Sequence, residues 1–189
     1  MFEDSLRTIA IEHVSPEIDG GRHAVKRIVG DLVRVEADIF KEGHDLLCAA
    51  ILWRKQGDTQ WNEAPMALFD NDRWAGSFVP HEIGLFEYVV EAWVDLYGSW
   101  VQEVRKKFDA GEQVSSELLE GRRLIEQAAS RASKQLASQL RAWLANWDSK
   151  TQQAERVELA CESSFVELLR TVPDRQRASR YDCILGLVV

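Results

Sequence analysis

Residues 32–40, Leu-Val-Arg-Val-Glu-Ala-Asp-Ile-Phe, alternate between apolar and charged side chains along most of their length. Successive side chains of a β-strand point to opposite faces of the sheet. The segment therefore predicts a strand with one buried face and one solvated face. The buried face would consist of Val33, Val35, Ala37 and Ile39, and the solvated face of Arg34, Glu36 and Asp38.

Further segments rich in β-branched and aromatic residues follow this strand at spacings of about 8–12 residues, which is typical of all-β domains. They cover residues 46–55, 61–68, 73–79, 86–95 and 99–106, with short turn sequences between them. No helical crossover separates these segments, so neighbouring strands should pair antiparallel. The first hundred residues thus predict an immunoglobulin-like antiparallel β-sandwich.

The second part of the chain has helical periodicity. From Val114 to Trp147, apolar residues recur at steps of mostly three and four, which predicts one long helix of roughly 50 Å. A second apolar stripe runs from Val157 to Val172, and Pro173 ends it. Two such helices predict a long α-helical hairpin behind the sandwich, so the expected fold class is α+β.

Composition and charge suggest the same division. Residues 1–100 contain nine Lys or Arg and eighteen Asp or Glu, whereas the remainder is almost neutral. We expect a sandwich domain over residues 1–107, a helical hairpin insertion over 108–175 and an atypical apolar tail over 176–189. The net charge of −8 argues against a nucleic-acid partner. The apolar runs are too short to span a membrane, and no secretory signal opens the chain.

Residue patterns for chemistry are sparse. The histidines are scattered, no Gly-x-Ser-x-Gly is present, and the Asp19–Arg22 loop lacks the Gly-Lys-Ser/Thr ending of a phosphate cradle. Asp70 and Asp72 flank Asn71 and are typical of a turn. The sequence therefore predicts no catalytic, cofactor-binding or metal-binding residue and no cofactor. The three cysteines, Cys48, Cys161 and Cys183, include no close pair and predict no disulfide framework. Cys48 and Cys161 are expected to be free buried thiols, which fits a reducing cytoplasm.

The seven tryptophans offer the other functional hypotheses. Trp53 and Trp93 fit the core of a sandwich or its rim. Trp61 at a strand start and Trp74 beside a turn are candidates for exposed rings that contact carbohydrate, although strand tryptophans commonly fill cores. Trp143 and Trp147 lie near the expected tip of the hairpin and are candidates for interface anchors.

Several ordered segments resemble the amino-terminal part of bacterial α-1,4-glucan:maltose-1-phosphate maltosyltransferases. They are residues 11–22 with 24–27, 43–45, 71–78 and 88–95, and the likeness covers about residues 7–178. The resemblance implies a β-sandwich with a helical insertion, placed ahead of an α-amylase-type barrel. It also implies a cytoplasmic, retaining enzyme of glycogen-like α-glucan synthesis that transfers maltosyl units through a covalent intermediate. A homodimer that involves the sandwich and the insertion is implied as well.

The family's catalytic carboxylates lie in the barrel, which this sequence lacks, so no residue here inherits their roles. Residues 180–189 do not align with the family, and we expect a truncated, frame-changed or partial product. The expected function is a non-catalytic accessory and dimerisation domain of a maltosyltransferase. Its expected partners are a second copy and the barrel of the parent enzyme, and α-glucan is a further candidate. The alternatives are a carbohydrate-binding module for α-glucan and a free-standing interaction or scaffold protein.

Overall fold

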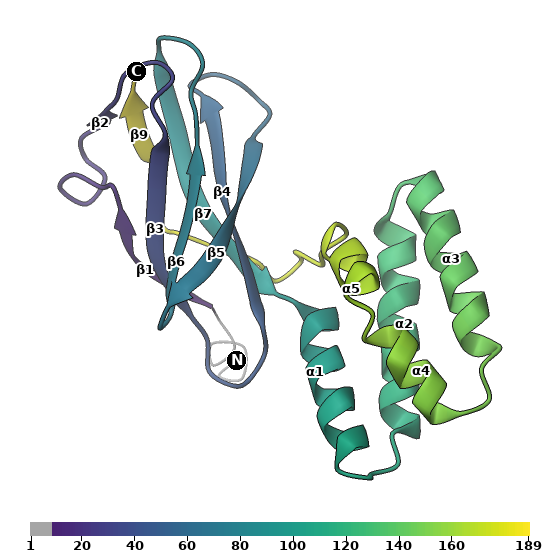
Figure 1. Cartoon of the computed structure of the whole chain (residues 1–189). Coiled ribbons are helices and arrows are strands. Elements are labelled where there is room, and N and C mark those ends of the chain that lie inside the picture. The colour runs from purple at the N-terminus through teal and green to yellow at the C-terminus, as the bar shows by residue number, and fades with distance from the viewer. Residues whose placement is uncertain (1–8) are drawn as a thin grey trace, which may run out of the picture. The chain divides into compact units, whose positions relative to one another are not determined.

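The computed structural model describes residues 9–189 (Figure 1), which fall into two compact units. The first, here the sheet unit, combines the described part of Met1–Gly43 with Leu47–Trp93 and Gln176–Val189. The second, here the helical unit, contains His44–Leu46 and Val94–Arg175. The helical unit is thus inserted between two segments that complete the same sheet.

The sheet unit contains a curled, mostly antiparallel sheet. Within residues 9–189, hydrogen bonding links its strands in the order β1-β3-β6-β5-β4-β7-β9-β2, with β8 paired to β7. The strands are β1 (Ala10–Ser15), β2 (Val25–Lys26), β3 (Val33–Phe40), β4 (Leu47–Lys55), β5 (Asn62–Asp70), β6 (Arg73–Phe78), β7 (Leu85–Val94), β8 (Ser179–Arg180) and β9 (Leu185–Val188). Antiparallel pairing is confirmed for most pairs, but β2 and β9 are parallel. The finer prediction of an immunoglobulin-like sandwich of two sheets stays a prediction.

The alternation in β3 predicts its burial correctly. Val33, Val35, Ala37 and Ile39 are fully or almost fully buried, and the charged residues between them reach solvent. Trp53 stacks on Phe78 with ring centroids 4.9 Å apart, and Trp93 is buried, so the predicted placement of both tryptophans in the core or at its rim is confirmed. The interior of the sheet unit is therefore built from the inward faces of its strands.

The apolar tail forms part of this sheet. β9 pairs antiparallel with β7 and parallel with β2, and its Leu185 and Leu187 are buried. Tyr181 adds a backbone hydrogen bond from its N–H to the carbonyl of Val90. The apolar segment therefore belongs to the sheet unit, and it pairs with strands as an apolar segment near an open sheet edge is expected to do.

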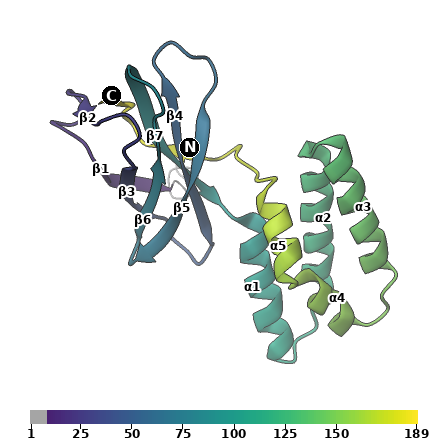
Figure 2. The same cartoon turned by 45° about the horizontal axis from the view of Figure 1, so that its top comes forward.

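The helical unit contains α1 (Leu96–Asp109), α2 (Ser115–Arg131), α3 (Lys134–Asp148), α4 (Gln153–Ala160) and α5 (Ser163–Arg170), as Figure 2 shows. The strand predicted over residues 99–106 is wrong, because these residues lie inside α1. Asp95 begins the helix by accepting a hydrogen bond from the Gly98 N–H at 2.9 Å. Tyr97, Trp100 and Val104 then recur at helical spacing and are buried. The change from strand to helix thus comes before the predicted boundary at residue 107.

The single long helix predicted from Val114 to Trp147 is also wrong. The chain leaves helical geometry at Ala132, whose ψ is 160°, and Ser133 caps α3 through the Leu136 N–H. The second predicted helix likewise divides into α4 and α5 at Cys161 and Glu162. The predicted hairpin is therefore a bundle of shorter helices.

The apolar stripes nevertheless predicted core residues of the helical unit correctly. Ile125, Leu140, Trp147, Val157 and Phe165 are all buried in one cluster inside the helical unit. An interrupted helix keeps its apolar face pointing inward when the break redirects the chain toward the same core. The domain ranges 1–107, 108–175 and 176–189 stay predictions.

Candidate functional site: a groove on the sheet unit

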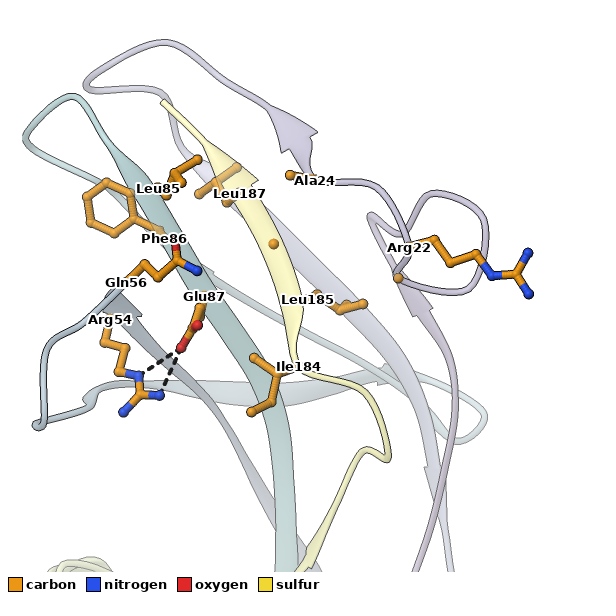
Figure 3. A pocket seen from close by; sticks show the side chains of 12 residues that line it. Arg22, Ala24, Arg54, Gln56, Leu85, Phe86, Glu87, Ile184, Leu185 and Leu187 are labelled. Atoms are coloured by element: carbon orange, nitrogen blue, oxygen red, sulfur yellow. Dashed lines mark hydrogen bonds and ion pairs between the residues drawn. The ribbon is translucent and has the colours of Figure 1, made fainter.

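A groove of about 390 Å³ lies on the sheet unit, over the end of β4 and the start of β7 and along β9 (Figure 3). Its polar lining comes from Arg54 of β4, Gln56 just after it, and Glu87 of β7, with Arg22 from the loop before β2. Its apolar lining includes Leu85 and Ile184, both about half exposed. The sheet groove, as we call it, is therefore open, mixed in polarity and assembled from segments far apart in the sequence.

The Arg54 guanidinium is held from several sides. Its Nε and Nη2 donate to the Glu87 carboxylate at 3.0 and 2.9 Å, and its Nη1 donates to the Asp58 carbonyl at 3.0 Å. Its Cζ also lies 4.2 Å from the centroid of the Trp61 ring. A cation over an indole is attracted by the negative face of the ring. Arg54 is thus fixed in place, and its charge is balanced by Glu87.

Trp61 is half-buried and is not among the residues that line the sheet groove, but its ring contacts Arg54, which is. For Trp74, the prediction of an exposed ring is wrong. Its side chain is buried, and its indole N–H donates to the Ile39 carbonyl at 3.2 Å. In β6, Trp74 pairs with Ala37 of β3, whose side chain is fully buried. Because residues opposite each other share a face, Trp74 is directed into the core.

Trp143 and Trp147 lie in the helical unit. Trp147 is almost fully buried, and its indole N–H donates to the Arg156 carbonyl at 2.7 Å, so its interpretation as an exposed anchor is wrong. Trp143 is half-buried and stacks on Phe165 with ring centroids 3.6 Å apart. Both rings serve the core of their own unit, and an interface role for Trp143 stays a prediction.

A second group of charged residues, missed in the sequence, joins β1, β3 and β6. Arg73 donates to Asp38 at 3.0 Å and to Glu36 at 3.2 Å, and His13 Nδ1 lies 2.8 Å from Asp38. The hydrogen bond from Arg34 holds the pKa of Glu36 below its ordinary value, and Arg73 does the same for Asp38. Carboxylates held in the charged form are poor proton donors near neutral pH, so this group is suited to joining strands rather than to acid catalysis.

Residues 9–189 contain no cluster of metal-ligating side chains and no disulfide. No three His, Cys, Asp or Glu side chains in this range are grouped so that they could hold a metal ion. The three cysteines are half-buried and form no disulfide, and burial raises the pKa of the Cys161 thiol. No helix among the described residues is long and apolar enough to cross a membrane.

These features define a class: a two-unit domain in which a mostly antiparallel sheet carries an inserted helical bundle and an open groove. The chain belongs to the family described as alpha-1,4-glucan:maltose-1-phosphate maltosyltransferase, domain N/S, whose sequence model matches residues 7–189. This match includes the tail, so the earlier limit near residue 178 was too short.

Named relatives agree with this assignment. The maltosyltransferase of Myxococcus xanthus is 43% identical over 189 residues, which is 96% of this chain and 28% of the relative. That of Chlorobaculum tepidum is 39% identical, over 98% of this chain and 28% of the relative. That of Picrophilus torridus is 36% identical, over 66% of this chain and 20% of the relative. The chain therefore spans little more than a quarter of the first two relatives.

Proposed function

We propose that this chain acts as a non-catalytic accessory and dimerisation domain of a maltosyltransferase. The whole enzyme would transfer maltosyl units from maltose 1-phosphate to α-1,4-glucan in the cytoplasm. The observation that carries the proposal is the family match over residues 7–189, together with the small share of each relative that this chain covers. The reacting carboxylates would lie in an α-amylase-type barrel outside this segment.

The arrangement of charges supports an accessory role. Arg54 is neutralised by Glu87, and Glu36 and Asp38 are neutralised by arginines. Glycosyl transfer with retention needs one carboxyl that can donate a proton and a second carboxylate free to attack. The carboxylates described here are engaged in joining strands, which fits a domain that supports catalysis performed elsewhere.

A chimera tests this function. Residues 7–189 would replace the matching segment of the Myxococcus xanthus maltosyltransferase, and phosphate release from maltose 1-phosphate would be measured. We expect the chimera to turn over substrate and the isolated chain to show none. The Myxococcus enzyme without the segment is the control for the domain's contribution. Turnover by the isolated chain, or a folded chimera without activity, would contradict the proposal.

The dimerisation part has its own measurement. Sedimentation velocity of the chimera and of the isolated chain at several concentrations should show a dimer for the chimera. A chimera that remains monomeric while active would reject the dimerisation role and leave the accessory role standing. The immunoglobulin-like sandwich belongs to the same proposal, and an experimental structure of the chimera would test it.

A second candidate is binding of α-glucan, favoured by the half-buried Trp61 ring next to Arg54. Indole faces stack on the apolar faces of sugar rings, and Gln56 and Glu87 line the sheet groove together with Arg54 and offer polar groups there. Titration calorimetry with maltoheptaose would show a signal that Trp61→Ala removes. Trp143→Ala, in the helical unit, is the matched control. Absence of heat with the unmodified chain would exclude this candidate.

A further inference from the structure

Exposed aliphatic side chains gather at one end of the sheet unit. Ile83 and Ile28 are 77% and 74% exposed, and Leu32, Leu85 and Val29 are also exposed. We call these five residues the apolar end. Ile28, Val29 and Leu32 come from the segment just before β3. Ile83 lies in the segment between the end of β6 and the start of β7, and Leu85 is the first residue of β7. Exposed apolar residues that lie together on one part of a folded domain are a candidate interaction surface.

Backbone hydrogen bonds hold these segments together. The Gly30 N–H donates to the Pro80 carbonyl at 3.0 Å, which joins the two exposed segments. The Arg27 N–H donates to the Val188 carbonyl at 2.9 Å, and the Gln56 N–H to the Leu85 carbonyl at 2.8 Å. The apolar end is therefore a fixed part of the sheet unit.

The apolar end is continuous with the sheet groove, because Leu85 belongs to both. Ile184 extends the aliphatic surface along the groove, as Figure 3 shows. Charged pairs lie beside it: Lys55 Nζ is 2.6 Å from Glu82, and Arg54 is paired with Glu87. An aliphatic centre with a charged rim is the usual composition of a protein–protein interface.

Val189 is hydrogen-bonded to the apolar end. Its N–H donates to the Gly84 carbonyl at 3.0 Å, and its own carbonyl accepts from the Gly84 N–H at 3.2 Å. Gly84 lies between Ile83 and Leu85, in the middle of the apolar end. A longer chain, such as those of the relatives, would leave the sheet unit from this surface. A segment tethered there meets the surface at high effective concentration.

We propose that the apolar end and the sheet groove together form the docking surface for the part of the maltosyltransferase that lies beyond this chain. The inference rests on the proposed function, since it takes its partner from that assignment. A protein partner fits better than α-glucan because the exposed large hydrophobic residues here are aliphatic and none is aromatic, and sugar rings are recognised by stacking on open aromatic rings.

Cysteine labelling in the isolated chain and in the chimera tests the proposal. Ile83→Cys reports on the apolar end. Leu68→Cys is the matched control, because Leu68 is also exposed in the sheet unit but lies on β5 near the opposite ends of the strands. Maleimide modification would be followed by mass spectrometry of the peptide that contains each new cysteine. The native thiols therefore do not interfere.

We expect the rate of modification at residue 83 to be at least about tenfold lower in the chimera than in the isolated chain. The rate at residue 68 should be equal in both. Equal rates at residue 83 in an active chimera would overturn the docking surface and leave the proposed function standing. An inactive but folded chimera would reject the proposed function, while protection at residue 83 would still support the docking surface. Equal protection at both positions would overturn its assignment to this end.

Other occupants give different results. Protection of residue 83 that grows with the concentration of the isolated chain would identify a second copy and overturn the proposal, as would protection by maltoheptaose. If the chimera does not fold, the isolated chain would be mixed with the separately produced remainder of the Myxococcus enzyme. A complex that Ile83→Asp weakens and Leu68→Asp does not would support the proposal, and no complex would overturn it.

Discussion

The two units treat their apolar residues differently. Of the large apolar residues that are exposed in residues 9–189, ten lie in the sheet unit and two, Leu96 and Leu119, in the helical unit. The helical unit encloses its aromatic rings, and even Trp147 is turned inward. The sheet unit leaves several aliphatic residues outside its core. This unequal exposure of apolar residues is what the proposed docking surface on the sheet unit requires.

The largest expected effect is on the core of the helical unit. Trp147→Ala should lower its free energy of unfolding by about 3–5 kcal/mol, because it removes a buried indole and leaves a cavity. Hydrogen exchange should accelerate in α3 and α4 more than in β3. Leu119→Ala is the control, since Leu119 is exposed, and it should change stability by less than about 0.5 kcal/mol. Equal acceleration in β3 would show that the two units unfold together.

Next in size is a matched pair of tryptophans in the sheet unit. Trp74→Phe should destabilise by about 1–3 kcal/mol, because the Ile39 carbonyl loses its buried donor. Trp61→Phe should cost less than about 1 kcal/mol, since it weakens only the stacking with Arg54. Urea unfolding of both variants measures the difference. A larger loss for Trp61 would mean that its contacts, and not those of Trp74, support the sheet.

A smaller effect should appear in acid, where α1 meets α2. The hydrogen bond from Lys107, 2.7 Å away, and bonds from the backbone and Ser116 lower the pKa of Glu117 to about 2 from its ordinary 4.5. A lowered folded-state pKa gives stability that is present above pH 4.5 and is lost as the pH falls toward 2. Glu117→Gln should make the stability of the helical unit depend less on pH in this window, and Glu120→Gln should leave that pH dependence unchanged. If thermal unfolding at low salt shows the same dependence of stability on pH in the Glu117→Gln variant, this account is contradicted.

The smallest expected effect concerns the apolar end, the exposed surface by which the sheet unit differs most from the helical unit. Ile83→Asp should change the stability of the isolated chain by less than about 0.5 kcal/mol, because the side chain is largely exposed. The same change in the chimera should lower its thermal stability, since a carboxylate would then face a covered apolar surface. Calorimetric melting of both proteins makes the comparison. A loss of stability in the isolated chain would show that Ile83 supports the sheet unit itself.

Local patterns predicted much of the fold. The alternation in β3 and the helical spacing of Ile125, Leu140 and Val157 identified core residues, because burial follows directly from periodicity. Helix α1 was missed although a signal was present. Asp95 precedes Tyr97, Trp100 and Val104 at helical spacing, but β-branched and aromatic residues suggested a strand.

The burial of Trp74 and the sheet groove could not be predicted in the same way. The orientation of Trp74 depends on the register of β6 against β3, which is set by contacts distant in the sequence. The groove depends on Ile184 reaching the neighbourhood of Glu87, through the pairing of β9 with β7. Neither pairing leaves a signal within a short window of sequence.

The place of β9 in the sheet also bears on the order of events during synthesis. Val188 pairs with Leu85, so this edge of β7 can form its strand pair with β9 only after about a hundred further residues have been synthesised. At roughly 5–20 residues per second, the ribosome needs about 5–20 s to supply it. The whole inserted bundle is translated within that interval. The nascent helices can therefore collapse first, while the incomplete β-structure remains open to chaperones until the final strand emerges.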